Sequence, residues 1–595
     1  MYHQSYDPLG NAILSTLVAA LPIATLLYFI AIHPHTDEEG HRHYGISAPW
    51  AAFFGVLIGF VVNLAMMRMP FGAALSSFVQ GAFSGFIGII WIVIGAMFLY
   101  TITLVTGKFE IVKESIIHVT FDRRLQVLVI AFSFGAIIEG TSGFGTPVAI
   151  AGAMMVGLGF PPLQSAVLNL LANTAPVAYG AIGTPIVTLA AVTGLSETAL
   201  STMAGRQLPF ASVLIPFWLV VTFVRMEGGT WGEAFEVWPA TAVAGVVFAV
   251  VQNLVSASES LHLLTDVFAG LTSVIAVVVF LRFWHPKQRF EMRAERAHVA
   301  ASGAGPGAMA KEEYSYPYSL RQTIAAWVPW VILIVCVAIW GTPGIKAALN
   351  TLLPKIDASL LGVHVSGNLS DPVFDMPFAN KLIQRAPPVA PVNAAPETVQ
   401  FVFNYLSAAG TGVVIAAVLS GVYLRMSAAQ WRQAVVRTAR RMRVPVLVIG
   451  QVLGLAALTR YGGTDAILGL AFTATGVLYP FFAAYLGWLG VFLGGSDTAS
   501  NALFGSLQKI TAQQLHLSPI LTAASNSTGG VMGKMIDPQS ITVATSACYE
   551  DPAEGRVALG PIFRTVFWHS IALAAFMGII VMLQAYVFTG MVPPG

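Results

Sequence analysis

Four charged side chains lie inside or beside long apolar runs of the sequence: Glu139, Asp497, Lys534 and Asp537. An ionised group at the centre of a bilayer costs at least about 2.5–3.5 kcal/mol, so its presence there indicates a function. Desolvation favours the protonated form of a carboxyl group, as a proton carrier requires. Glu139, Asp497 and Asp537 are therefore candidate proton-coupling residues. Lys534 is a candidate partner for an anionic ligand, with a structural ion pair between Lys534 and Asp537 as the alternative.

Polar, Gly-rich interruptions surround these charges in two similar places. The first pair falls at 134–147 and 170–176, and the second pair falls at 489–501 and 523–530. In both pairs, a proline follows twelve positions after an asparagine of the second interruption, Pro185 after Asn173 and Pro538 after Asn526. Paired interruptions at matching places in two halves indicate the binding site of a secondary transporter.

The interruptions supply groups that suit a small anion. Unpaired backbone groups in hydrocarbon cost several kcal/mol, so a break survives only where protein or a wet cavity satisfies it. A half-helix that begins after a break points free N–H groups at the gap. For any single residue the alternative is close helix packing, which small residues permit. Besides Lys534, the candidate substrate-binding residues are Gly140, Thr141, Ser142, Gly143, Asn173, Thr174, Ser496, Thr498, Ser500, Asn501, Asn526, Ser527 and Thr528.

The composition identifies the class of protein that must hold these residues. Of 595 residues, 56% are hydrophobic and only 10% are charged, whereas soluble proteins carry about 25% charged residues. Runs such as 12–32, 51–67 and 566–588 are long enough to span a bilayer. A net charge of +2 gives no basic excess for nucleic acid, and the two cysteines form no metal-binding motif. We expect an all-α polytopic membrane protein without cofactor or metal ion.

Basic loops predict the orientation of the chain. The stretch 425–443 carries six arginines and no acid, and 282–321 carries seven Lys or Arg residues, so both are expected in the cytoplasm. The Pro-rich stretch 342–398 then faces outward, and both termini are expected in the periplasm. We expect the basic helix 425–443 to lie along the inner membrane surface, where anionic lipids attract it.

This orientation constrains the interrupted segments. Residues 125–206 must cross the membrane an odd number of times but contain too much apolar sequence for one helix. A re-entrant hairpin at 125–160 and one broken crossing at 163–195 give an odd number of crossings. By the same reasoning, 479–513 is expected to be a re-entrant hairpin and 519–548 a broken crossing. The prediction is about twelve transmembrane helices plus two re-entrant hairpins in inverted repeats, with fourteen full crossings as the alternative. The expected units are an N-terminal membrane half (1–284) with its repeat at 125–195, a cytoplasmic loop (285–323), and a C-terminal half (324–595) with its repeat at 479–548 and the outer loop 342–398.

Nearly the whole chain resembles the bacterial L-lactate permease family. The resemblance implies import of L-lactate and related 2-hydroxymonocarboxylates, including D-lactate and glycolate, with protons across the bacterial inner membrane. It also implies a superfamily of ion transporters whose inverted repeats carry re-entrant hairpins tipped by Ser, Asn and Thr. Family members carry Ser in place of Asp537, which argues against Asp537 as the shared coupling residue. The matching motifs are 6–11, 139–147, 173–178, 205–210, 487–493, 495–504, 528–530, 533–535 and 538–540.

The expected function is therefore proton symport of lactate, with Asp497 or Glu139 as the proton carrier. The alternative is a sodium-coupled transporter of di- or tricarboxylates, because Ser, Asn and Thr at hairpin tips suit Na⁺ equally well. A membrane enzyme would need a nucleophile–base or metal constellation at one depth, which the sequence does not offer. A channel is disfavoured by the inverted repeat. The expected partners are the substrate, protons and membrane lipids, and the oligomeric state stays open.

Overall fold

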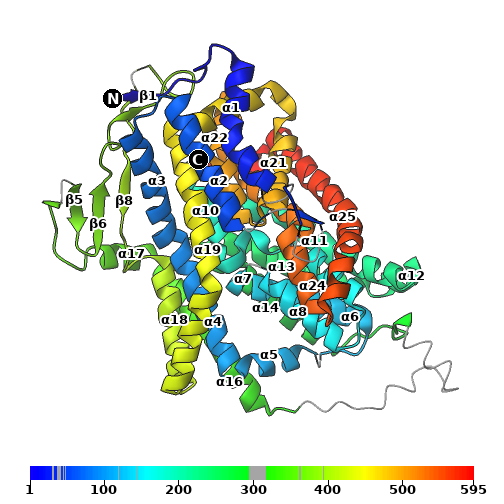
Figure 1. Ribbon diagram of the computed structural model, residues 1–595. Helices are drawn as coiled ribbons and strands as arrows, with labels where there is room; N and C mark the ends of the chain where they lie inside the picture. The colour runs from blue at the N-terminus through cyan, green and yellow to red at the C-terminus, as the bar shows by residue number, and fades with distance from the viewer. Residues whose placement is uncertain are drawn as a thin grey trace.

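Long apolar helices make up most of the computed structural model (Figure 1), which describes residues 1–29, 33–36, 42–44, 46, 48–117, 119–143, 145–293, 317–360, 363–392 and 394–594. Within those residues, nine helices are long and apolar enough to cross a membrane, and four shorter apolar helices accompany them. These helices confirm the prediction of an all-α polytopic membrane protein. The number of crossings and the re-entrant hairpins stay predictions.

The first half of the chain begins with the helices α1 to α5. Two interrupted helices follow, one with a break between α7 and α8 and one with a break between α9 and α10. A continuous helical rod over Phe71–Val105 is formed by three successive segments. The described elements are β1 (Tyr2–His3), α1 (Ala12–Leu27), β2 (Pro34–Thr36), β3 (Arg42–Tyr44), α2 (Ala48–Ala65), α3 (Phe71–Gly85), η2 (Phe86–Ile90), α4 (Trp91–Val105), α5 (Lys108–Ile117), α6 (Arg123–Val127), η3 (Leu128–Phe134), α7 (Gly135–Ser142), α8 (Thr146–Gly157), α9 (Pro162–Ala172), η4 (Val177–Tyr179), α10 (Gly180–Thr193), α11 (Glu197–Met226), α12 (Trp231–Glu236), α13 (Trp238–Ser256), η5 (His262–Leu264) and α14 (Thr265–Phe280).

The second half repeats the sequence of whole helices followed by interrupted helices. The described elements are α16 (Leu320–Gly341), α17 (Pro343–Asn350), β4 (Ala358–Leu360), β5 (Val363–Asn368), β6 (Asp371–Asp375), β7 (Ile383–Gln384), β8 (Gln400–Val402), α18 (Ala409–Tyr423), α19 (Ala428–Gly462), α20 (Thr464–Phe472), η7 (Thr473–Leu478), α21 (Tyr479–Gly494), α22 (Asp497–Gln514), α23 (Pro519–Gly533), η8 (Lys534–Ile536), α24 (Pro538–Cys548), α25 (Pro552–Tyr586) and η9 (Thr589–Met591).

The stretch 342–398 folds into a small β-structure that the sequence did not indicate. Strands β4, β5, β6 and β8 form an antiparallel sheet beside α3 (Figure 1), and Gln80 of α3 donates from Nε2 to the Gln400 carbonyl at 3.1 Å. The N-terminal strand β1 pairs in parallel with β7, with Tyr2 opposite Ile383. The N-terminus and this stretch therefore lie side by side, and their position relative to the membrane stays a prediction.

The sequence led us to expect a separate surface helix over the arginine-rich stretch 425–443. The structure does not contain one. Instead, α19 begins at Ala428 and continues without interruption through Pro445 to Gly462. A capping box between Ser427 and Gln430 fixes its start. The arginines thus extend a spanning helix beyond its apolar part, which corrects the expectation.

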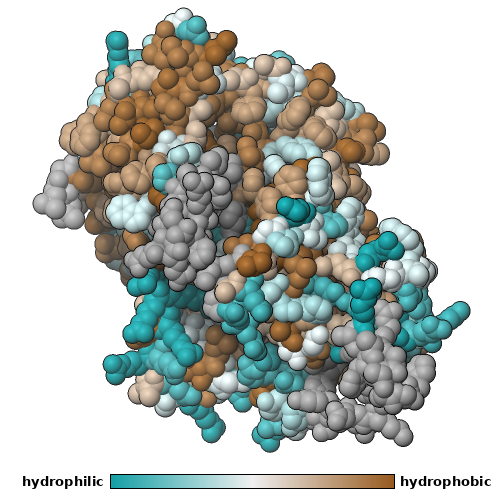
Figure 2. Space-filling model, turned by 45° about the vertical axis from the view of Figure 1, so that its right-hand side comes forward, coloured by the Kyte–Doolittle hydropathy of each residue, from teal (hydrophilic) through white to brown (hydrophobic). Residues whose placement is uncertain are grey.

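The surface of the molecule is apolar where lipid would contact it. Figure 2 shows apolar side chains over the upper part of one face and hydrophilic ones gathered at its lower end. On α2, Phe53, Leu57 and Val61 are exposed and spaced by one helical turn. A continuous exposed stripe of this kind is unfavourable in water and neutral in hydrocarbon.

Candidate substrate-binding site

The first break separates α7 from α8 at two glycines with positive φ. Gly143 has φ 57° and Gly145 has φ 76°, a region that residues with a Cβ adopt only under strain. Close packing also favours glycine, because a Cβ on Gly143 would lie 2.9 Å from the Cβ of Ala181. The glycine-rich sequence therefore ends α7 where another interrupted segment approaches.

That neighbouring segment is the break between α9 and α10, which are bent by 67°. After Asn173, the chain passes through η4 and then three left-handed residues, Ala181, Ile182 and Gly183. Two non-glycine residues in this region cost on the order of 1–3 kcal/mol each, so the surrounding packing must hold them. Regular helix resumes at Thr184.

The second half contains two corresponding breaks, but the later one does not lie at 523–530 as expected, because α23 stays helical through Gly533. Gly495 has φ 70° and ends α21, and Ser496 then caps α22 by accepting a hydrogen bond from the Ala499 N–H. Between α23 and α24, η8 is followed by Asp537, whose carboxylate accepts from the N–H groups of Gln539 and Ser540. The first N–H groups of α22 and α24 are thus partly satisfied by their own caps, whereas α8 has no side-chain cap.

The interrupted segments of the two halves pack against each other reciprocally. Helix α8 packs on α24, and its counterpart α22 packs on α10. Likewise α11, which follows the first broken helix, packs on α23, and α25, which follows the second, packs on α9. Exchange of equivalent contacts in this way is the pattern of two repeats related by a two-fold axis.

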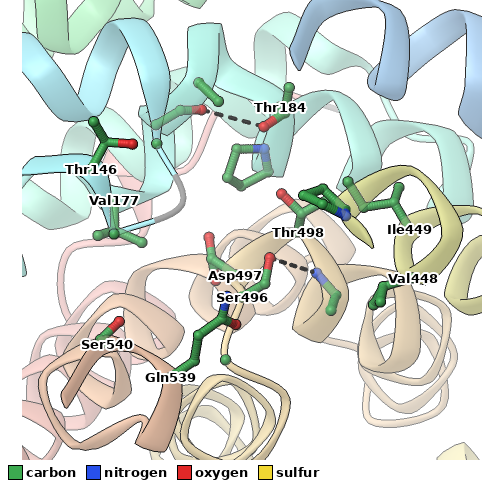
Figure 3. A pocket seen from close by; sticks show the side chains of 18 of the residues that line it. Thr146, Val177, Thr184, Val448, Ile449, Ser496, Asp497, Thr498, Gln539 and Ser540 are labelled. Carbon is green, nitrogen blue, oxygen red and sulfur yellow. Dashed lines mark hydrogen bonds between the residues drawn. The ribbon is translucent and has the colours of Figure 1, made fainter. Parts of the chain in front are cut away.

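A cavity of about 380 Å³ lies where the breaks meet. Figure 3 shows Ser496, Asp497 and Thr498 facing Thr146, Val177 and Thr184 of the first half, with Val448 and Ile449 of α19 at the side. The candidate residues that line the cavity are Glu139, Gly143, Ser496, Asp497, Thr498 and Lys534. This volume is within the range of small-molecule sites.

Several other candidates lie directly behind the wall of the cavity and hold Asp497. Ser527 donates from Oγ to Asp497 Oδ2, and Asn501 Nδ2 lies 3.4 Å from the same oxygen. Asn526 Nδ2 donates to Asn501 Oδ1 at 2.9 Å and is 3.3 Å from Ser500 Oγ. These four residues form one buried polar network that orients the Asp497 carboxylate.

The remaining candidates make hydrogen bonds away from the cavity or pack closely. Thr141 and Ser142 donate their hydroxyls to the carbonyls of Ile137 and Ile138, one turn back in α7. Thr528 Oγ1 donates to Gln207 Oε1 at 2.6 Å. Gly140 permits close approach of α14, since a Cβ there would lie 2.9 Å from the Asp266 Cβ. Thr174 is fully buried, and its hydroxyl has no hydrogen-bond partner in the described part of the chain.

Lys534 spans the second pair of breaks. Its Nζ donates to the Gly495 carbonyl at 2.6 Å and lies 3.1 Å from Asp537 Oδ2. Only 5% of the Lys534 surface is exposed, yet the residue lines the cavity. The structural ion pair between Lys534 and Asp537 is therefore present, and the same ammonium group is also placed to contact a ligand.

Sequence reasoning missed two charged residues near the cavity. Asp266, near the start of α14, is fully buried beside Gly140, and an acid at the edge of the apolar run 262–284 could have revealed it. Arg441 of α19 lines the cavity at its border with a second one of about 650 Å³, and its Nη2 lies 3.5 Å from Thr146 Oγ1. Thr146 and Arg441 line both cavities, so the two cavities are adjacent.

Comparison with known proteins shows end-to-end relatives of the chain. It is 41% identical to the glycolate permease GlcA of Escherichia coli K12 over 99% of both chains. It is 40% identical to the L-lactate permease of Bacillus subtilis strain 168, again over 99% of both. Among solved structures, the YdaH transporter of Alcanivorax borkumensis covers 99% of this chain and 100% of its own at 13% identity, with a TM-score of 0.42, too low to establish a shared fold. The L-lactate permease family model matches residues 15–588, so the chain belongs to the L-lactate permease family of membrane transporters.

Proposed function

We propose that this protein imports L-lactate, and also D-lactate and glycolate, by proton symport across the bacterial inner membrane. The observation that carries the proposal is the cavity between the two pairs of breaks, where carboxyl groups, hydroxyls and one ammonium group converge. Relatives at about 40% identity are named permeases for glycolate and L-lactate. These substrates share a carboxylate and a neighbouring hydroxyl, which the cavity can contact separately.

The substrate carboxylate is best placed near Lys534 and the first turn of α8. Lys534 supplies a positive charge, and the uncapped N-terminus of α8 supplies backbone N–H groups with partial positive charge. The hydroxyls of Thr146, Thr184 and Thr498 lie on the cavity wall and suit the 2-hydroxyl group. Because a site built to bond a hydroxyl rejects analogues that lack it, propionate should be a poor substrate.

The charges around the cavity explain why a proton should accompany the anion. Glu139, Asp266, Asp497 and Asp537 are all buried, and Lys534 is the cation bonded among them. Lys534 already pairs with Asp537, so a further carboxylate would meet repulsion from the other acids if they stayed ionised. Protonation of one of them removes this repulsion. Proton and substrate then each increase the affinity for the other.

The same proton offsets the membrane potential. A single negative charge that moves inward alone opposes a potential worth about 2.3 kcal/mol per 100 mV. Co-transport of one proton makes the loaded site neutral, and the proton gradient drives uptake. The second cavity, reached past Thr146 and Arg441, is the proposed route between the site and the cytoplasm.

The reciprocal packing of the two halves supports the re-entrant, inverted repeats. In this arrangement, 125–160 enters from the cytoplasm and 479–513 from the periplasm, so their tips meet near the bilayer centre. Alternating access would expose the site first to one side and then to the other, with both termini in the periplasm.

Purified protein in proteoliposomes tests this function. With an inwardly directed proton gradient, lactate added outside should make the external medium more alkaline. Without a proton gradient, labelled lactate should still exchange in counterflow. Counterflow without any lactate-dependent alkalinisation would refute proton coupling. Net uptake that requires Na⁺ in a potassium background would favour the sodium-coupled carboxylate transporter instead.

A further inference from the structure

The strongest unexplained feature is a pair of buried acids, Glu139 on α7 and Asp266 on α14. Asp266 is 0% exposed and Glu139 is 3% exposed. Both Asp266 oxygens and Glu139 Oε2 lack hydrogen-bond partners in the part of the chain that the structure describes. Two neighbouring carboxyl groups, one of which has neither a hydrogen bond nor a cation, resist being ionised together in a medium of low dielectric.

The packing of the two helices brings these acids together. Gly140 directly follows Glu139, and a Cβ at Gly140 would lie 2.9 Å from the Asp266 Cβ and 2.9 Å from the Val267 nitrogen. On its other side, Glu139 Oε1 approaches the backbone at Gly180, where a Cβ would lie 2.4 Å from that oxygen. Glycine at both positions lets the carboxyl of Glu139 sit between α14 and the left-handed segment of α10.

In the part of the chain that the structure describes, Asp266 has no cation beside it. The titratable side chains that interact with it among the described residues are Glu139 from α7 and Tyr179 from η4. The Tyr179 hydroxyl donates to the Ser201 carbonyl at 2.6 Å and so does not serve the acid. Lys534 interacts with Glu139 but bonds to Gly495 and Asp537. The Asn173 amide lies beside the Glu139 carboxyl and interacts with it, although neither amide atom has a partner of good hydrogen-bond geometry among the described residues.

Asp497, the other candidate proton carrier, is in a different situation. Its Oδ2 accepts from the Ser527 hydroxyl and lies 3.4 Å from Asn501 Nδ2, whereas its Oδ1 has no partner in the described part of the chain. Hydrogen bonds of this kind favour the ionised form of a carboxyl group. Asp266, by contrast, has no such bond on either oxygen among the described residues, so the pair of Glu139 and Asp266 is the better place for a proton.

From this geometry we propose that Glu139 and Asp266 share one proton, and that Asp266 is a further residue of the coupling site. This inference rests on the proposed proton symport. Glu139 lines the cavity and exchanges the proton with it, whereas Asp266 lies behind Glu139 and does not touch the cavity. Its negative charge holds the proton on the pair until the site opens, because loss of the proton would leave two adjacent carboxylates.

The test compares Asp266→Asn with wild type in proteoliposomes, by lactate counterflow over a range of pH and by lactate-driven alkalinisation. In wild type, exchange should fall at alkaline pH, when the pair loses its proton. Without the Asp266 charge, Glu139 gives up its proton more easily, so this alkaline limit should move down by about one pH unit, a tenfold change in proton affinity. Net uptake should fall about tenfold while exchange at acidic pH remains.

Asp465→Asn is the matched control. Asp465 is also a buried acid, but it accepts hydrogen bonds from Ser506 and the Ala466 N–H and lies outside the cavity wall. Its variant should keep the wild-type pH profile. A wild-type profile and wild-type proton movement in Asp266→Asn would overturn the pair and leave proton symport standing. Absence of lactate-driven proton movement in wild type would instead overturn the symport itself.

A second measurement applies if Asp266→Asn fails to fold. Infrared difference spectra of wild-type protein with and without lactate should contain a band from a protonated carboxyl group, and Glu139→Gln should shift or remove it. Spectra without such a band, or a band unchanged in Glu139→Gln, would overturn the proposal.

Discussion

Replacement of Lys534 by glutamine separates the proposed binding role of this residue from its structural role. The ammonium group has three donors, of which one bonds to Gly495 and one to Asp537. One donor therefore remains for a ligand. A hydrogen bond to a charged group contributes about 1.5–3 kcal/mol, so lactate should bind about 10- to 150-fold more weakly to Lys534→Gln.

The same substitution should also destabilise the protein. Breaking a buried ion pair costs about 3–5 kcal/mol. The loss should lie near the lower limit, because Asp537 keeps hydrogen bonds from Gln539 N at 2.8 Å, Ser540 N at 3.0 Å and Ser540 Oγ at 2.6 Å. The double variant with Asp537→Asn removes both charges and should regain most of the stability.

Equilibrium binding of labelled lactate and thermal unfolding of the purified protein measure the two effects. We expect the double variant to be nearly as stable as wild type and still to bind lactate weakly. Wild-type affinity in the double variant would show that Lys534 serves only the ion pair and would refute its placement against the substrate.

Three further substitutions test other parts of the site. Gly530→Ala places a Cβ 2.4 Å from Asp497 Oδ1 and should reduce lactate counterflow at least about tenfold. The control Gly560→Ala has open space around the new Cβ and should leave counterflow unchanged. Equal activity of the two variants would contradict the tight packing at Gly530. Arg441→Gln should raise the KM for lactate a few-fold at low salt and much less at high salt, because salt screens the attraction between the exposed arginine and the anion. Arg437→Gln, outside both cavities, is its control. A change in KM that does not depend on salt would contradict this role. Gly495→Ala forces a left-handed alanine at φ 70° and should lower stability by about 1–2 kcal/mol, measured by thermal unfolding; unchanged stability would argue against the break at this position.

The sequence predicted the class of fold and three of the four breaks, because these depend on local properties. The interruption expected at 523–530 was wrong, since α23 continues through these residues to Gly533 and the break follows at η8 and Asp537. Apolar runs of sufficient length form spanning helices, and Gly143, Gly145 and Gly495 occupy left-handed positions that glycine favours. The repeated spacing from asparagine to proline also corresponds to repeated structure, since Pro185 and Pro538 both lie in the helix that follows the second break of their half.

The orientation of side chains could not be read from the sequence. Thr141 and Ser142 belong to a hydroxyl-rich break, but their hydroxyls bond to carbonyls of their own helix, an option open to any Ser or Thr in a helix. Asp266 is distant in the chain from both breaks, and only the packing of α14 against α7 brings it to Glu139.

Longer elements were misjudged where local sequence allows two outcomes. A basic amphipathic stretch suits either a surface helix or the extension of a spanning helix, and the uninterrupted backbone of α19 selects the second. The strands of the sheet, three within 342–398 and β8 just after it, are three to six residues long. They are too short to produce a clear alternating pattern among prolines.

The central claim is that lactate binds between the two pairs of broken helices. A cryo-electron microscopy structure of the protein in lipid nanodiscs with saturating lactate tests it most directly. We predict density for one small acid between the first turn of α8 and Lys534, within hydrogen-bond distance of Thr146 or Thr498. Uninterrupted helices through residues 125–206 and 479–548, or lactate bound outside this cavity, would contradict the account.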